Sequence, residues 1–184
     1  TRLAIVGLQS RETQPFTAEH WTVTVNGEIY NHKELGSKDG ASDCSVITSL
    51  LTQHSPVDVC RMLNGIFSFV AYHDVSGTAV IARDPIGVTP LYYAVQDGHL
   101  HVSSLLETFP GSVEHVQTFP PGHVAIYHEG QIDFTRYTDP YETSWAPHSF
   151  DADEHLTAVD NICAQLATRL EEAVRRRLMG DAPW

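Results

Sequence analysis

A run of short apolar segments between residues 66 and 134 constrains the fold more than any other feature of this sequence. Segments 66–72, 78–82, 91–95 and 100–103 are rich in Val, Ile, Ala and aromatic residues, and polar turns that contain Asp and Gly separate them. Several segments carry apolar side chains at consecutive positions, which is typical of strands covered on both faces. Residues 123–127 and 132–134 add another hairpin. The pattern predicts antiparallel sheets that are covered on both sides or packed on each other.

Helical patterns stand before and after this strand-rich part. Residues 43–53 follow a capping Ser42 and place Val46, Ile47, Leu50 and Leu51 on one face, and residues 57–63 predict a second short helix. Residues 138–151 are rich in Pro, Ser, Thr and Asp, as in a linker, whereas apolar residues recur at helical spacing over 153–178. We therefore expect a first domain over residues 1–138, a linker over 139–152 and the start of a second domain over 153–184.

Charge and composition exclude several classes of protein. The chain has 184 residues and a net charge of −12, a sign that repels phosphate backbones and anionic lipid, so neither nucleic acid nor a membrane is an expected partner. No apolar run approaches the length of about 20 residues that spans a bilayer. The three cysteines lack the spacing of a zinc site or a disulfide framework. No metal site is expected in this segment, and a reducing, cytoplasmic location is the simplest interpretation.

Asn26 and Gly27 raise the first functional question. They follow a strand-like segment, 21–25, and Asn-Gly is a strong signal for a hairpin turn. The segment after Gly27 is polar and does not look like a returning strand of equal quality. A strand that ends on Asn-Gly would instead present a side-chain amide and an unhindered backbone N–H as neighbouring donors, which is what an oxyanion hole requires. Local pattern alone leaves both interpretations open and favours the plain turn.

Three further residues allow a structural and a functional interpretation. Arg2 adjoins an apolar strand, where a guanidinium needs a carboxylate partner, but it also fits a surface position at a strand end. Asp43 fits the first turn of a helix, and it could also receive the ammonium group of a ligand. Thr1 could act as an N-terminal nucleophile, an interpretation that its place in an apparent strand disfavours. The eleven histidines are scattered and receive no role.

Taken together, the order of segments resembles glutamine-hydrolysing asparagine synthetases of the B type. The resemblance extends over nearly the whole chain and is carried by a set of motifs, no one of which is decisive alone. These motifs are residues 2–6, 25–32, 42–47, 63–69, 83–92, 120–123 and 177–183.

The resemblance implies an α+β fold and an activity. The expected fold is a class II glutamine amidotransferase domain with the Ntn-hydrolase αββα sandwich of two antiparallel sheets, followed by the first helix of an all-α synthetase domain. The expected activity is transfer of glutamine-derived ammonia to aspartate activated by ATP, which yields asparagine, glutamate, AMP and pyrophosphate. Glutamine, aspartate and ATP are thus the implied partners. ATP and Mg would be bound outside this segment, and the resemblance allows a homodimer.

The resemblance also implies roles for individual residues. The Asn26 side chain and the Gly27 N–H would stabilise the oxyanion formed when a cysteine thiolate attacks glutamine, and Arg2 would bind the α-carboxylate of glutamine through two hydrogen bonds. Glu28 and Asp43 would hold the α-ammonium group. The full implied glutamine site is Arg2, Leu3, Ala4, Ile5, Val6, Asn26, Gly27, Glu28 and Asp43.

The printed sequence departs from the family pattern at the nucleophile. In the family this is a cysteine at the mature N-terminus, and Cys44, Cys60 and Cys163 each lie within a predicted helix. The 184 residues are therefore expected to bind glutamine without hydrolysing it. Ser103, Ser104 and Leu105 also stand where relatives often carry Ser-Glu. Two alternatives remain, namely a relative that forms β-lactams without using glutamine and a non-catalytic interaction module.

Overall fold

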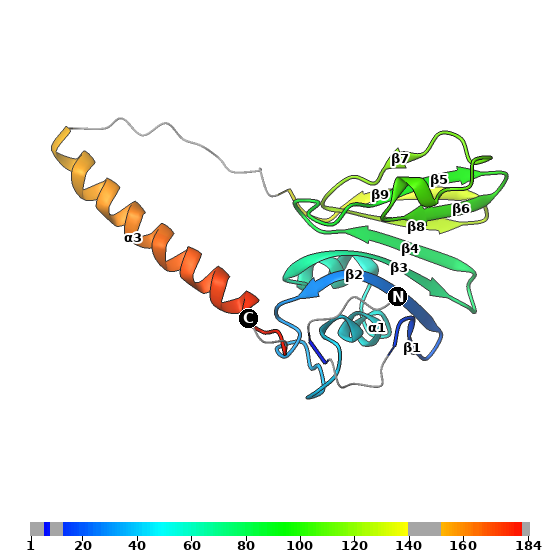
Figure 1. The fold of residues 1–184 in the computed structure, drawn as a ribbon, viewed down its shortest axis with the longest axis horizontal. Helices are drawn as coiled ribbons and strands as arrows, with labels where there is room; N and C mark the ends of the chain where they lie inside the picture. Colours follow the sequence, from blue (N-terminus) through cyan, green and yellow to red (C-terminus); the bar gives the residue numbers. More distant parts are fainter. Residues whose placement is uncertain (1–5, 8–12, 140–151, 182–184) are drawn as a thin grey trace.

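Two antiparallel sheets form the centre of the molecule in the computed structural model, which describes residues 6–7, 13–139 and 152–181 (Figure 1). The larger sheet has six strands in the order β1-β2-β3-β4-β8-β9, and the smaller has three in the order β6-β5-β7. The strands of the larger sheet are β1 (Phe16–Ala18), β2 (Trp21–Ile29), β3 (Gly65–His73), β4 (Thr78–Arg83), β8 (His123–His128) and β9 (Gln131–Arg136). Those of the smaller are β5 (Tyr92–Gln96), β6 (His99–Ser103) and β7 (Gln117–Thr118).

Helices α1 (Val46–Leu51) and α2 (Pro56–Met62) pack on the six-stranded sheet and follow a short 3₁₀ turn, η1 (Asp43–Ser45). The expected helix over 43–53 is thus split into a 3₁₀ turn and a short α-helix. Helix α2 begins with Pro56 after Ser55, whose hydroxyl accepts the Asp58 N–H at 3.2 Å, so its N-terminus is capped as the sequence suggests. A second 3₁₀ turn, η2 (Leu106–Thr108), follows β6.

Strand β4 explains why the apolar segments have no polar face. Its side chains alternate between two buried clusters, with Val80 and Ala82 in the core under the helices and Ile81 in the core between the sheets. Leu91 and Phe119 complete the second core from the side of the smaller sheet. The predicted α+β class and the two antiparallel sheets are confirmed, and the described residues form three layers in the order helix, sheet, sheet.

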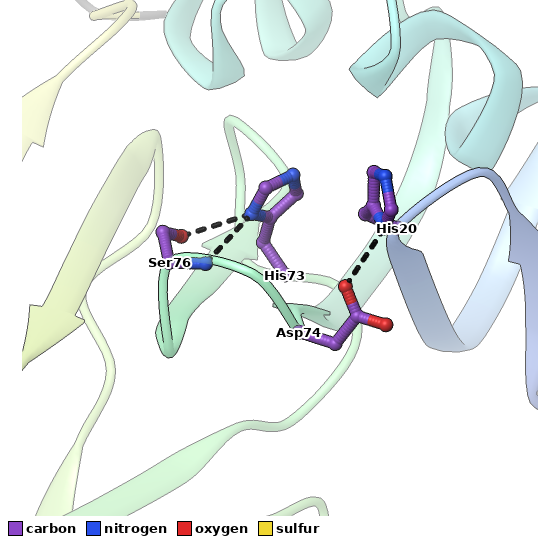
Figure 2. A network of polar contacts seen from close by, with 4 residues as sticks. All are labelled: His20, His73, Asp74 and Ser76. Carbon is purple, nitrogen blue, oxygen red and sulfur yellow. Dashed lines mark hydrogen bonds and ion pairs between the residues drawn. The ribbon is translucent and has the colours of Figure 1, made fainter.

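Two histidines, the exposed His20 and the half-buried His73, make polar contacts at the turns that join β1 to β2 and β3 to β4 (Figure 2). His20 Nδ1 lies 3.1 Å from Asp74 Oδ1, and the Asp74 N–H donates to the His20 carbonyl, which joins the β1–β2 turn to the β3–β4 turn. His73 Nδ1 accepts the Ser76 N–H at 3.3 Å and lies 2.9 Å from its hydroxyl. These contacts give the two histidines a local structural part far from the residues of the implied site.

Helix α3 (Ala152–Arg177) confirms the predicted long helix over residues 153–178. Its apolar side chains from Val159 onward are exposed, and Ile162 is 61% exposed. The end of α3 returns to the segment that follows β2 (Figure 1), where Asp181 Oδ2 accepts the Gly7 N–H at 2.6 Å. The predicted linker over 139–152 lies almost wholly outside the described residues, so the division into domains stays a prediction.

Strand β2 differs from the sequence prediction in length. It does not end at Val25 but continues to Ile29 and pairs with β3 throughout, from Trp21 opposite His73 to Ile29 opposite Gly65. Asn26 and Gly27 therefore lie inside a strand, and both a hairpin turn and a strand tip are wrong for them. Long-range pairing with β3 outweighs the local turn preference of Asn-Gly.

Candidate functional site

The candidate site begins at the edge of β2 that faces away from β3. Strand β1 covers this edge only opposite residues 21–23. Beyond that point a side chain takes the place of a strand, because Gln14 accepts the Val25 N–H at 2.7 Å and donates to the Val25 carbonyl at 2.9 Å. Two pairs further along, Asp43 Oδ2 accepts the Ile29 N–H at 2.7 Å. The backbone groups of Val25 and Ile29 thus point to the same edge.

Gly27 lies between these two residues and presents its backbone to that edge as well. Alternate residues of an antiparallel strand direct their N–H and C=O groups to the same side. Its partner on β3, Phe67, turns its own backbone the other way, toward Asp84, with a 2.8 Å bond from the Asp84 N–H to the Phe67 carbonyl. The Gly27 carbonyl accepts the Cys44 thiol at 3.3 Å. The Gly27 N–H is therefore directed to a strand edge that no strand among the described residues covers, as a donor to a ligand would be.

Position 27 admits no side chain. A Cβ placed there would lie 2.1 Å from the Ile66 carbonyl oxygen and 2.6 Å from the Phe67 Cα, and the φ angle of +151° is one that side chains rarely adopt. Both obstacles are backbone atoms of a central strand, which cannot move aside cheaply. The glycine is required by the close approach of β3, and the unhindered N–H follows from it.

The Asn26 side chain extends from the face of β2 that lies toward the smaller sheet. Its Nδ2 lies 3.3 Å from Ser104 Oγ, just after β6. Both residues line a cavity of about 240 Å³ between the sheets, together with Ser68 and Leu91. Gly27 and Asn26 thus offer one donor at the strand edge and one in the adjoining cavity.

Two acidic residues flank Gly27. Asp43 is only 3% exposed and uses Oδ2 to hold Ile29. Glu28 is half-buried, and its pKa is raised above the ordinary value by burial and by the Asp43 carboxylate, while the Arg177 guanidinium acts in the lowering direction. Asp43 lies in η1 as the first-turn interpretation expected, and it also stands close enough to Glu28 for the two charges to interact.

Comparison with known proteins identifies the protein family of this chain. Residues 1–110 match the family described as a glutamine amidotransferase domain. The chain belongs to this glutamine amidotransferase domain family.

Two curated relatives match the amidotransferase chain over its whole length. The glutamine-hydrolysing asparagine synthetase of Sandersonia aurantiaca is 39% identical over 193 residues, and asparagine synthetase 1 of Lotus japonicus is 37% identical over 191 residues. The chain spans 34% and 30% of these two relatives, or about a third of their length. These relatives support the main interpretation of the sequence rather than a β-lactam-forming enzyme or an interaction module.

A solved structure supports the fold. The glutamine phosphoribosylpyrophosphate amidotransferase from B. subtilis superposes with a TM-score of 0.58 at 20% identity, over 68% of this chain and 32% of that one. At this identity the likeness concerns the fold alone, and it agrees with the predicted Ntn-hydrolase architecture.

The three cysteines of the amidotransferase chain are poorly suited to attack a substrate. Cys44 and Cys60 are buried, and burial raises the pKa of each thiol, which for Cys44 the neighbouring Asp43 carboxylate raises further. Cys163 is exposed on α3. The prediction placed all three in helices. Cys60 and Cys163 do lie in α-helices, whereas Cys44 lies in the 3₁₀ turn η1.

The structure brings together part of the implied glutamine site. Asn26, Gly27, Glu28 and Asp43 gather at the end of β2, and Val6 is buried. Arg2, Leu3, Ala4 and Ile5 lie outside the described residues. Three contributors were missed from sequence, namely Gln14, Ser104 and Arg177, and each contacts the site from a distant part of the chain.

Two negative findings concern the described ranges 6–7, 13–139 and 152–181. They contain no group of three or more His, Cys, Asp or Glu side chains that could hold a metal ion. They also contain no helix long and apolar enough to cross a membrane.

Proposed function

We propose that this chain is the glutamine-binding part of a glutamine-dependent asparagine synthetase. The observation that carries the proposal is the similarity over the whole chain, at 37–39% identity, to relatives named as glutamine-hydrolysing asparagine synthetases. In the whole enzyme, ammonia released from glutamine would react with aspartate activated by MgATP, giving asparagine, AMP and pyrophosphate. The synthetase chemistry, a cytoplasmic location and a homodimeric assembly belong to the same proposal.

The glutaminase half of the reaction needs an oxyanion hole. A cysteine thiolate attacks the side-chain amide carbon of glutamine, and the carbonyl oxygen becomes negatively charged in the tetrahedral intermediate. In our proposal the Gly27 N–H and the Asn26 Nδ2 donate to this oxygen. The direction of the Gly27 N–H toward the strand edge beyond β1 supports this role. Removal of one such donor typically lowers kcat by about 10²–10³.

The remaining residues recognise the amino-acid end of glutamine. Arg2 would bind the α-carboxylate, and residues 3–6, which are Leu3, Ala4, Ile5 and Val6, would line the same side of the substrate. Glu28 and Asp43 would hold the α-ammonium group. The pKa of Glu28, raised by burial and then by the Asp43 carboxylate, supports this assignment, because a cationic group beside the two carboxylates offsets their repulsion.

Collapse of the tetrahedral intermediate would release ammonia and leave a thioester, which water then converts to glutamate. The proposal gives the nucleophilic step to the N-terminal cysteine that the resemblance implies, since Cys44 and Cys60 are buried with raised pKa values and Cys163 lies on α3. The printed residues would then supply substrate binding and oxyanion stabilisation.

The test compares two substrates of the full-length enzyme, glutamine and free ammonia. Asn26→Ala should lower kcat for glutamine hydrolysis about 100-fold and leave asparagine formation from ammonia unchanged. Asn161→Ala is the matched control, because Asn161 is exposed on α3 and its side-chain oxygen accepts a hydrogen bond from Gln165 on the same helix. Unchanged glutamine hydrolysis in Asn26→Ala would contradict the oxyanion role. Absence of glutamine-dependent asparagine formation in the wild type would overturn the proposed function.

A further inference from the structure

The last residue of α3 lies against the end of β2. The guanidinium of Arg177 stands over the Tyr30 ring, 4.6 Å from its centroid, and Arg177 Nη1 also donates to the Ala173 carbonyl at 2.8 Å. Tyr30 follows Glu28 by two residues, and its N–H donates to the Asn64 carbonyl at 2.7 Å, so the strand geometry carries on to this point. Glu28 and Tyr30 therefore face the same side.

A second contact ties the same segment to the other side of the site. Asp181 Oδ2 accepts the Gly7 N–H at 2.6 Å. Gly7 has a φ of +66°, and a Cβ there would lie 2.7 Å from the Ala41 carbonyl oxygen, two residues before Asp43. Residues 177–181 thus touch both the chain beside Val6 and the chain beside Glu28.

The charge of Arg177 also reaches the acidic pair. Burial and the Asp43 carboxylate both raise the pKa of Glu28, and Arg177 is the cation that opposes them. Burial raises the pKa of the Tyr30 hydroxyl, and the Arg177 guanidinium acts in the lowering direction. Arg177 lines a cavity of about 560 Å³ together with Tyr30, Asn64 and Ile66, so the helix end and the β2–β3 end share one hollow.

Its neighbours on the helix behave differently. Arg175 pairs with Glu171 at 2.7 Å, as the spacing predicts for a solvated helix face. Arg176 is exposed and makes no hydrogen bond or ion pair in the part of the chain that the structure describes. All three consecutive arginines are exposed, but Arg177 differs from the other two in lying over an aromatic ring of another element.

We propose that Arg177 is a positioning residue of the glutamine site, which holds the end of β2 through its contact with the Tyr30 ring and so keeps Glu28, two residues earlier on the same side, in place for the α-ammonium group of glutamine. The inference rests on the function proposed above and deepens it. Because Arg177 is the last residue of α3, a displacement of this helix relative to β2 would remove the guanidinium from Tyr30. Glutamine binding is thereby coupled to the position of α3.

The experiment measures glutamine and ammonia kinetics of the full-length enzyme. Arg177→Ala should raise KM for glutamine about tenfold, the range of a cation–π contact on the half-buried Tyr30 ring plus a nearby charge, with a smaller change in kcat. The reaction with ammonia should be unchanged. Arg176→Ala removes the same charge one residue away and should leave both reactions at wild-type values. Arg177→Lys keeps the charge without the planar guanidinium and should recover part of the affinity.

A second variant separates positioning from a general loss of structure. Tyr30→Leu should raise KM for glutamine to a similar extent, and the double variant should be no worse than the poorer single one, because both remove the same contact. Equal glutamine KM in Arg177→Ala and Arg176→Ala would overturn the inference while leaving the proposed function intact. A parallel loss of the ammonia reaction in Arg177→Ala would also overturn it, since the residue would then act on the whole fold. A wild type without glutamine-dependent activity would overturn the proposed function and this inference with it.

Discussion

Two buried aspartates at the ends of different elements differ in how many hydrogen bonds their oxygens accept. Asp84 follows β4 and is 1% exposed, and Asp43 starts η1 and is 3% exposed. The Asp84 carboxylate accepts six hydrogen bonds. Its Oδ1 accepts the N–H groups of Ile86 at 3.1 Å, Gly87 at 2.7 Å and Val88 at 3.1 Å, and its Oδ2 accepts the Phe67 N–H at 3.4 Å and the Thr89 N–H and hydroxyl at 3.3 Å each.

The Asp43 carboxylate, by contrast, accepts fewer hydrogen bonds than it could. Its Oδ2 accepts the Ile29 N–H at 2.7 Å and a weak 3.6 Å contact from the Cys44 thiol, and within the described ranges no hydrogen bond reaches Oδ1. An ionised carboxylate offers about four acceptor sites. The difference teaches that burial alone does not distinguish a structural carboxylate from one that binds a ligand. The saturated Asp84 organises its loop, whereas Asp43 can still receive a donor from a substrate.

The largest expected effect is on stability and belongs to Asp84. In Asp84→Asn, an NH₂ group replaces one carboxylate oxygen, and it cannot accept hydrogen bonds from the N–H groups that point to that position. We expect the free energy of unfolding to fall by about 3 kcal/mol, because several buried N–H groups lose their acceptor. Urea denaturation of the variant measures this. Asp74→Asn is the matched control, since the Asp74 side chain is 64% exposed and bonds an equally accessible His20. An equal loss in both variants would remove the basis for calling Asp84 structural.

The next effect is on substrate affinity and belongs to Asp43. Asp43→Asn keeps an oxygen for the Ile29 N–H, so the free energy of unfolding should fall by only about 1 kcal/mol. Loss of the negative charge should raise KM for glutamine about 100-fold, the scale of one buried charge pair. Steady-state kinetics with glutamine and with ammonia check this, and only the glutamine reaction should change. A variant that loses as much stability as Asp84→Asn and keeps its glutamine KM would make both aspartates structural.

The parts of this picture that sequence predicted are the local ones. Consecutive apolar residues such as Val80, Ile81 and Ala82 predict a strand covered on both faces, because the pattern itself records burial on each side. The extent of β2 could not be predicted in the same way. Its continuation past Asn26 depends on pairing with residues of β3 that are 36 or more positions away, where the Ile66 carbonyl excludes a side chain at Gly27.

The site was predictable only through the resemblance. Gln14 looks like any polar residue before a Pro, yet its amide occupies the open edge of β2 in place of a strand. Ser104 and Arg177 carry no local signal either, since each acquires its contact through folding of distant segments. The full use of the Asp84 oxygens and the unused Oδ1 of Asp43 likewise depend on three-dimensional partners, and in the sequence each residue is a single aspartate beside a turn.

The smallest expected effect concerns Glu28 and distinguishes the two aspartates by pH. Burial, then the Asp43 carboxylate, raises the pKa of Glu28 above its ordinary value of 4.5, while Arg177 opposes the shift. The folded state therefore holds this proton more tightly than the unfolded state. The stability that this tighter proton binding contributes is complete below pH 4.5 and is lost as pH rises through the folded-state pKa.

Glu28→Gln should remove this decline, which makes the free energy of unfolding less dependent on pH just above 4.5. Asp43→Asn should weaken the decline because the second largest cause of the shift is gone, and Asp84→Asn should leave it in place because Asp84 does not act on Glu28. Urea denaturation of the three variants across this pH range measures the slopes. Equal slopes in Asp43→Asn and Asp84→Asn would mean that the Asp43 charge does not reach Glu28, and the shared ammonium site would lose its electrostatic support.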